Sequence, residues 1–198
     1  NSIDIKNSLI LSAKAMAKNG SIKGINIFSK TLQAVSSIPG VSGSLDAYLP
    51  EKYKTLLSST DTEFSKLLAD LSIKDQTVFL NNFELNHNAY IITGKGKSTF
   101  TGELNLSAQF KLTSALTAEM VTRQPKLALL QDNAKNIVIP IIIKKEGSMI
   151  IVIPDLGDLA SRAAKNVATE TATKALDKVA PGLGGVGKSL GGFFRCLS

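Results

Sequence analysis

The stretch PGLGGVGKSL, residues 181–190, contains a pattern that could bind phosphate groups. Gly182, Gly187, Lys188 and Ser189 fit G-x-x-x-x-G-K-S, the loop whose backbone amides cradle the phosphates of ATP or GTP. A working loop of this kind joins a buried strand to the start of a long helix. Here a helical pattern precedes the motif, and only nine residues follow Ser189. We therefore interpret the match as accidental and expect no nucleotide site.

The remaining reactive residues do not form a pattern that indicates catalysis or metal binding. His87 is the single histidine, so any Ser–His or Cys–His mechanism would depend on it, and its polar surroundings favour an exposed structural role. Cys196 is the single cysteine, which excludes an intramolecular disulfide. No His or Cys residues have the spacing of metal ligands. We expect a protein that is not an enzyme and that needs no metal or cofactor.

The composition is that of a globular protein with a basic surface. The chain has 198 residues, 43% of them hydrophobic and 20% charged, and a net charge of +7. The positive excess is spread over both ends, which argues against nucleic-acid binding and is compatible with anionic lipid headgroups. No apolar run approaches the roughly 18 residues that span a bilayer. Because the chain opens with Asn1, we expect a piece of a longer protein.

The N-terminal third predicts two strands and a helix. Residues 2–11 alternate enough to indicate an opening strand, and a second strand over 20–27 follows a turn predicted at Asn19 and the glycine after it. Apolar side chains at helical spacing then predict a helix over 27–38. Residues 40–60, which are rich in Ser, Gly and Pro, indicate a loop with one turn of helix.

The middle of the chain predicts an antiparallel sheet. Strands are expected over 67–74, 77–86, 88–96 and 99–114, and residue propensities also allow a short helix near 62–69 at the start of the first. The last one alternates most regularly, which indicates a strand with one apolar and one wet face; its apolar residues include Leu104, Leu106, Phe110 and Leu112. Residues 137–143 and 148–153 indicate a hairpin around a KKEG turn. Short connections between these strands favour an antiparallel meander over βαβ units.

After Pro154 the apolar residues recur at helical spacing again. They predict a long amphipathic helix near 155–180, with acidic residues in its first turn and lysines near its end. The predicted fold class is therefore α+β: a mainly antiparallel, curved sheet with a short helix near 27–38 and this long helix. We expect one domain over 1–180 and a glycine-rich flexible tail over 181–198.

Several stretches together resemble the C-terminal region of the AsmA family of bacterial envelope proteins. The resemblance rests on motifs that occur in the family's order: NGSIKGINIFSKTLQAV at 19–35, TDTEFSKLLADLSIKD at 60–75, AYIITGKGKSTFTGELNLSAQFKL at 89–112, IVIPIII at 137–143 and IPDLGDLASRAAK at 153–165. Each motif alone is weakly specific, and the ordered set covers most of residues 19–180.

The resemblance implies a periplasmic domain whose parent protein is anchored in the inner membrane and takes part in outer-membrane biogenesis. It implies phospholipid transport between the two membranes through an apolar β-groove, without catalysis. Leu104, Leu106, Phe110 and Leu112 are then the candidate lipid-contacting residues. The same alternation also fits a sheet whose apolar face is closed by its own helices. In that alternative the domain is a protein-interaction module that assists outer-membrane protein assembly and binds a partner on an edge strand.

The C-terminal tail carries a second candidate lipid contact. Leu190, Phe193 and Phe194 belong to an apolar stripe at helical spacing, close to Lys188 and Arg195. Apolar side chains beside cations favour the surface of an anionic membrane. We expect phospholipid or another envelope lipid as the partner, with envelope proteins as further partners, and no nucleic acid or nucleotide.

Overall fold

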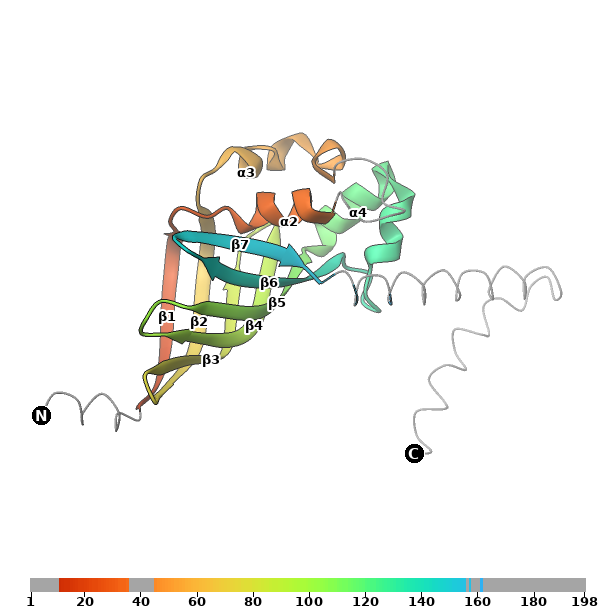
Figure 1. Cartoon of the computed structure of the whole chain (residues 1–198). Helices are drawn as coiled ribbons and strands as arrows, with labels where there is room; N and C mark the ends of the chain where they lie inside the picture. The colour runs from red at the N-terminus through yellow and green to blue at the C-terminus, as the bar shows by residue number, and fades with distance from the viewer. Residues whose placement is uncertain (1–10, 36–44, 156, 158–160, 162–198) are drawn as a thin grey trace, which may run out of the picture. The chain divides into compact units, whose positions relative to one another are not determined.

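A computed structural model describes residues 11–35, 45–155, 157 and 161 of the chain. Seven strands form one antiparallel sheet in which each strand pairs with the next one along the chain (Figure 1). They are β1 (Leu11–Ile22), β2 (Thr62–Lys74), β3 (Thr77–Asn86), β4 (Tyr90–Thr99), β5 (Leu104–Leu112), β6 (Val138–Glu146) and β7 (Met149–Pro154). β1 and β7 do not pair with each other, so the sheet is open. The predicted α+β class and antiparallel meander are confirmed.

The helices of the described residues all belong to connections at one end of this sheet. Between β1 and β2 lie α2 (Ile27–Val35), η1 (Leu45–Tyr48), η2 (Glu51–Tyr53) and α3 (Thr55–Ser58); between β5 and β6 lie α4 (Ser114–Arg123) and η3 (Pro125–Leu130). We call this the helix end of the sheet. At the opposite end, the hairpin end, the described residues form the tight β2–β3, β4–β5 and β6–β7 turns (Figure 1).

The chain divides into two units, residues 1–159 and 160–198. All the strands and helices named above belong to the first unit. The predicted domain over 1–180 and the tail over 181–198 stay predictions. The long helix predicted near 155–180 lies outside the described residues, apart from a few positions at its start.

The short predicted helix is confirmed as α2, and its start has a clear physical cause. Asn26 caps it: the backbone N–H of Ser29 donates a 2.9 Å hydrogen bond to Asn26 Oδ1. The Asn26 side-chain amide in turn donates to the carbonyls of Leu56 and Ser59, both at 2.7 Å. Phe28, with 1% of its surface exposed, leads the buried stripe of the helix. The Asn26 cap therefore ties the start of α2 to residues 56–59, and the buried stripe packs the helix into the core.

The predicted strand over 20–27 and the turn at Asn19 are wrong. β1 runs without interruption from Leu11 to Ile22 and pairs with β2 on both sides of Asn19. The Asn-Gly pair instead produces a local irregularity. Asn19 has a φ of 51° and no paired residue in β2, and the pairing continues at Gly20 without a shift. The strand predicted over 2–11 lies outside the described residues, except for Leu11.

The region after the regular strand also differs from expectation. The predicted strand over 99–114 is shorter at both ends, because a turn with Gly102 at a φ of 92° precedes it and α4 begins at Ser114. α4 and η3 were not predicted. Residues 45–58, expected as a loop with one helical turn, hold three short helices.

The core lies between the helices and the inner face of the sheet at the helix end. Three aromatic rings from different elements meet there: Phe28 of α2, Tyr90 of β4 and Phe110 of β5. Their centroids lie 5.3 Å (Phe28–Tyr90), 5.9 Å (Phe28–Phe110) and 5.3 Å (Tyr90–Phe110) apart. All three side chains are buried. Aromatic contacts of this kind contribute about 0.5–1.5 kcal/mol each beyond their buried area, so this cluster ties α2 to the sheet.

Two glycines in β4 allow the sheet to bend toward its inner face. Gly94 and Gly96 lie on the same face as Ile92, opposite Ala108 and Leu106 of β5. A Cβ on Gly94 would lie 2.8 Å from the Ala108 Cα, and a Cβ on Gly96 would lie 2.7 Å from the Leu106 Cα. Glycine is therefore required for this close approach, which curves the sheet around a hollow.

Candidate functional site

An apolar groove lies on the inner face of the sheet, beside the closed core. It has a volume of about 210 Å³, and the described residues that line it are all Ile, Leu, Phe or Ala, from β1 to β7, the β1–α2 connection and the start of α2. Its lining includes Leu67, Leu80, Leu104, Leu106, Ile143 and Ile150. With no polar side chain in the lining, the groove offers hydrocarbon contact and no specific hydrogen bond.

The pairing register explains why the lining is continuous across the strands. Side chains on neighbouring strands that oppose each other point to the same face. One row across β2 to β7 consists of paired residues without a charge: Leu71, Leu80, Gly96, Leu106, Ile143 and Val152. The opposite face of β5 carries exposed polar residues such as Asn105 and Ser107. The sheet therefore has one apolar and one wet face.

The structure divides the four predicted lipid-contacting residues into two pairs. Leu104 and Leu106 line the groove and keep part of their surface exposed. Phe110 and Leu112 are 0% exposed, because they lie at the helix end. Phe110 is held there by the Phe28 ring of α2. The prediction of lipid contact is therefore corrected for Phe110 and Leu112, which belong to the closed core, and is kept for Leu104 and Leu106.

The groove also contains residues that the sequence patterns did not single out. In β3 the pairing with β4 shifts between Leu80 and Phe83, because Asn81 and Asn82 lie between them where regular alternation has one residue. Leu80 and Phe83 nevertheless both line the groove. The adjacent polar pair, Asn81 and Asn82, was the only available signal of this bulge.

His87 lies at the helix end, at a shallow hollow of about 490 Å³ that it shares with Glu63 and Asn19. Its ring stacks on Tyr90 at 4.7 Å, and its Nδ1 accepts a 3.2 Å hydrogen bond from the Ala89 N–H. Burial lowers the pKa of His87, although nearby Glu63 acts in the opposite direction. His87 is thus half-buried rather than exposed, and it orders the β3–β4 turn.

Neither metal binding nor membrane spanning is indicated by the described part of the chain. Within it, no three His, Cys, Asp or Glu side chains gather where they could hold a metal ion. None of its helices combines the length and apolar character required to cross a bilayer. The residues of the phosphate-loop match and of the tail lie outside the described residues: Gly182, Gly187, Lys188, Ser189, Leu190, Phe193 and Phe194.

The fold and groove together define an open antiparallel β-sheet protein with an apolar inner face. No protein-family model, curated protein or solved structure matches the chain. The AsmA resemblance therefore rests on the ordered sequence motifs alone.

Proposed function

We propose that this domain binds lipid acyl chains in its apolar groove, without catalysis, and contributes to phospholipid transport between the inner and outer membranes. The observation that carries the proposal is the groove itself, whose lining is entirely hydrocarbon and includes Leu104 and Leu106. Removing one methylene from water contributes about 0.8 kcal/mol, so a few buried methylenes hold a chain without any polar contact.

The dimensions and polarity of the groove fit transport better than storage. Its volume of about 210 Å³ is below the roughly 300–1,000 Å³ of most small-molecule pockets, so it holds only part of an acyl chain. A groove without polar groups has little selectivity for the headgroup, and a lipid held by hydrocarbon contact alone is released readily. The net charge of +7 favours anionic lipids at the surface.

The cellular setting is proposed from the AsmA resemblance. In this setting the domain lies in the periplasm, and a segment outside this chain anchors its parent in the inner membrane. The amphipathic helix near 155–180 and the membrane-contacting residues Leu190, Phe193 and Phe194 belong to the same proposal. The tail would bring the groove close to a bilayer surface.

The alternative, a protein-interaction module with a closed apolar face, has less support. It requires the helices to cover the whole inner face of the sheet. Within the described residues, the helices close the helix end, where Phe110 and Leu112 are buried, and the groove remains beside them. We therefore place lipid binding first.

Site-specific photocrosslinking tests the proposal with a matched control on one strand. The photoreactive residue p-benzoylphenylalanine replaces Leu106, which faces the groove, or Ser107, which faces solvent on the opposite side of β5. After incubation with radiolabelled phosphatidylglycerol vesicles and irradiation, the Leu106 variant is expected to carry labelled lipid and the Ser107 variant none. Circular dichroism shows that both variants are folded.

Two results would contradict lipid binding in the groove. Equal labelling at both positions would indicate adsorption to vesicles without insertion of a chain. Absence of label at Leu106 in a folded protein would leave the groove without a lipid ligand. A further variant, Leu104→Asp, is expected to reduce labelling at Leu106, because a carboxylate in the groove is costly to desolvate.

A further inference from the structure

The two edge strands of the sheet, β1 and β7, are covered to different extents. α2 packs against β7 and lies alongside it, so that edge is partly covered (Figure 1). β1 pairs only with β2 among the described residues, and its outer side carries no strand or helix of that part of the chain. Every residue from Leu11 to Asn19 is exposed. A free edge of this length is unusual, because natural proteins cover or shorten such edges.

The backbone of β1 is already held in the geometry that a further strand needs. Eleven residue pairs join β1 to β2, from Leu11–Ile73 to Ile22–Thr62. In an antiparallel pair, alternate residues direct their N–H and C=O groups away from the neighbouring strand. The outer side of β1 therefore presents a row of backbone donors and acceptors, and because β1 is already ordered, only the partner segment pays an ordering cost on binding.

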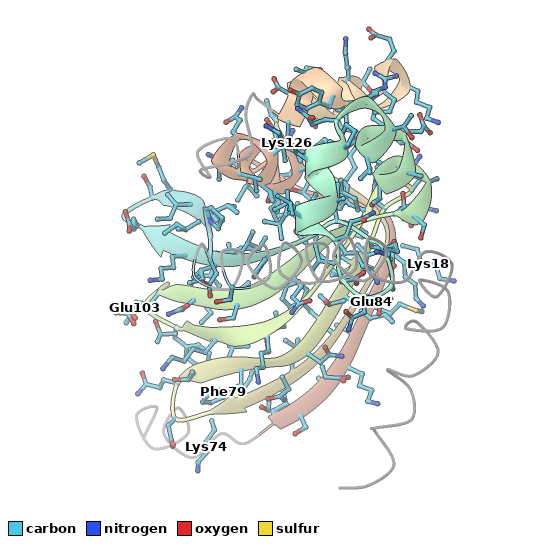
Figure 2. The ribbon with its side chains drawn as sticks, turned by 90° about the vertical axis from the view of Figure 1, so that its right-hand side faces the viewer. Lys18, Lys74, Phe79, Glu84, Glu103 and Lys126 are labelled. Atoms are coloured by element: carbon cyan, nitrogen blue, oxygen red, sulfur yellow. The ribbon has the colours of Figure 1, made fainter. Side chains whose placement is uncertain are left out.

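The side chains of β1 indicate the chemistry of the strand that fits. On the inner face Ala13, Ala15 and Ala17 are small, so larger apolar side chains of an added strand have space beside them. On the outer face stand Lys14 and Lys18; Lys14 lies opposite Asp70 of β2, and Lys18 lies opposite Lys66. Figure 2 shows Lys18 projecting from this side of the sheet.

Lys14 lies opposite a carboxylate, that of Asp70, whereas Lys18 lies opposite a second lysine, Lys66. The ion pairs among the described residues are Lys23–Asp61, Lys52–Glu119 and Lys54–Glu51, so none reaches Lys14, Lys18 or Lys66. Opposite charges on adjacent strands stabilise pairing, and like charges directly opposite destabilise it. A strand with carboxylates on its outer face is therefore the complementary partner.

We propose that β1 binds an extended segment of a partner protein by strand addition. The segment alternates apolar residues, which point to the inner face, with acidic or polar ones, and two carboxylates four residues apart lie opposite Lys14 and Lys18. A second copy of this chain fits less well, because two β1 edges would bring four lysines onto one face. The added strand continues the apolar inner face of the sheet.

Fluorescence anisotropy with short labelled peptides tests this proposal on the whole chain. The probe contains the core Val-Glu-Val-Thr-Val-Glu-Val, whose glutamates have the spacing of Lys14 and Lys18 and whose pattern reads the same in both directions. A second peptide replaces the glutamates by lysines. The glutamate peptide is expected to bind about tenfold or more tightly than the lysine peptide, from two cross-strand charge pairs.

Charge variants show whether the peptide preference comes from β1 or from the general charge of the protein surface. Lys14→Gln combined with Lys18→Glu changes only exposed residues of β1 and places no like charges opposite each other, because residue 14 lies opposite Asp70 and residue 18 opposite Lys66. Folding is therefore expected to be retained, and the preference is expected to reverse in favour of the lysine peptide. The control combines Lys95→Glu with Lys97→Glu, two exposed lysines on the interior strand β4. This control is expected to keep the preference of the wild type.

N-methylation shows whether the peptide binds as a strand. Two glutamate peptides carry methyl groups on alternate amides, one on the valines and the other on the remaining residues. Because alternate amides point to opposite sides of a strand, one isomer is expected to bind normally and the other about tenfold or more weakly.

Several outcomes would overturn the proposal. They are equal binding of the two N-methyl isomers, a preference that does not follow the charge of residues 14 and 18, and absence of binding by the glutamate peptide. Self-association of the wild type through β1, measured by analytical ultracentrifugation and abolished by a proline in β1, would identify a second copy as the occupant and overturn it as well.

Discussion

Two identical substitutions on one strand test the division of the inner face into a closed core and an open groove. Leu104 and Leu112 both lie in β5 and belong to the same apolar alternation. Leu112 is 0% exposed, whereas Leu104 is partly exposed and lines the groove. Each is replaced by alanine, so the same atoms are removed from the two environments.

The expected losses of stability differ several-fold. Leu112→Ala leaves a cavity in a packed core, and such changes lower the free energy of unfolding by about 2–5 kcal/mol. Leu104→Ala removes atoms that are already partly in water and leaves no enclosed cavity, so the expected loss is about 1 kcal/mol or less. Each kcal/mol lowers Tm by roughly 2–4 °C in a protein of this size, so Leu112→Ala should lower Tm by about 10 °C.

Urea unfolding followed by far-UV circular dichroism measures both values on the same preparation. The slope of free energy against urea is expected to stay unchanged, so the midpoints report stability directly. If Leu104→Ala destabilised the protein as much as Leu112→Ala, Leu104 would belong to a closed core. The reasoning that separates groove from core on β5 would then be refuted.

Two further predictions concern Gly96 and His87. Gly96→Ala is expected to lower the free energy of unfolding by about 1–3 kcal/mol in urea unfolding, because its Cβ would lie 2.7 Å from the Leu106 Cα; an unchanged midpoint would contradict the close approach of β4 and β5. The pKa of His87 is lower in the folded protein than its ordinary value of about 6.5 in the unfolded chain. As the pH falls through about 6.5, the unfolded chain therefore binds the proton more readily than the folded protein, and the folded protein loses stability. His87→Gln should reduce this loss between pH 7 and 5, measured as urea midpoints, and identical pH profiles for both proteins would count against it.

Local patterns were sufficient to predict the elements whose periodicity is regular. The alternation within 99–114 predicted β5, and the apolar stripe over 27–38 predicted α2. The hairpin of β6 and β7 was also predicted, but its turn is shorter than the expected KKEG stretch. Lys144, Lys145 and Glu146 belong to β6, and the turn consists of Gly147, with a φ of 61°, and Ser148. In each case the signal comes from residues within one element and its turn.

Where a long-range contact overrode a local signal, prediction failed. The Asn19-Gly20 pair is typical of a hairpin turn, yet β2 pairs with the residues on both sides of it and keeps β1 continuous. The gain from cross-strand pairing exceeds the preference of two residues for a turn. α4 was missed because its moderately apolar sequence becomes buried only through residues such as Leu116 and Met120, which contact the distant core.

The sequence by itself determined that the inner face of β5 is apolar, because alternation requires only that neighbouring side chains point to opposite faces. It did not determine which part of that face is open. Leu104 and Phe110 carry the same pattern, and only the position of α2, about eighty residues earlier in the chain, buries one and leaves the other in the groove. The same holds for the edges, since α2 packs against β7 and no described element covers the outer side of β1. Whether a side chain is buried depends on which residues pack against it, and for Phe110 the packing residue, Phe28, comes from a distant part of the sequence.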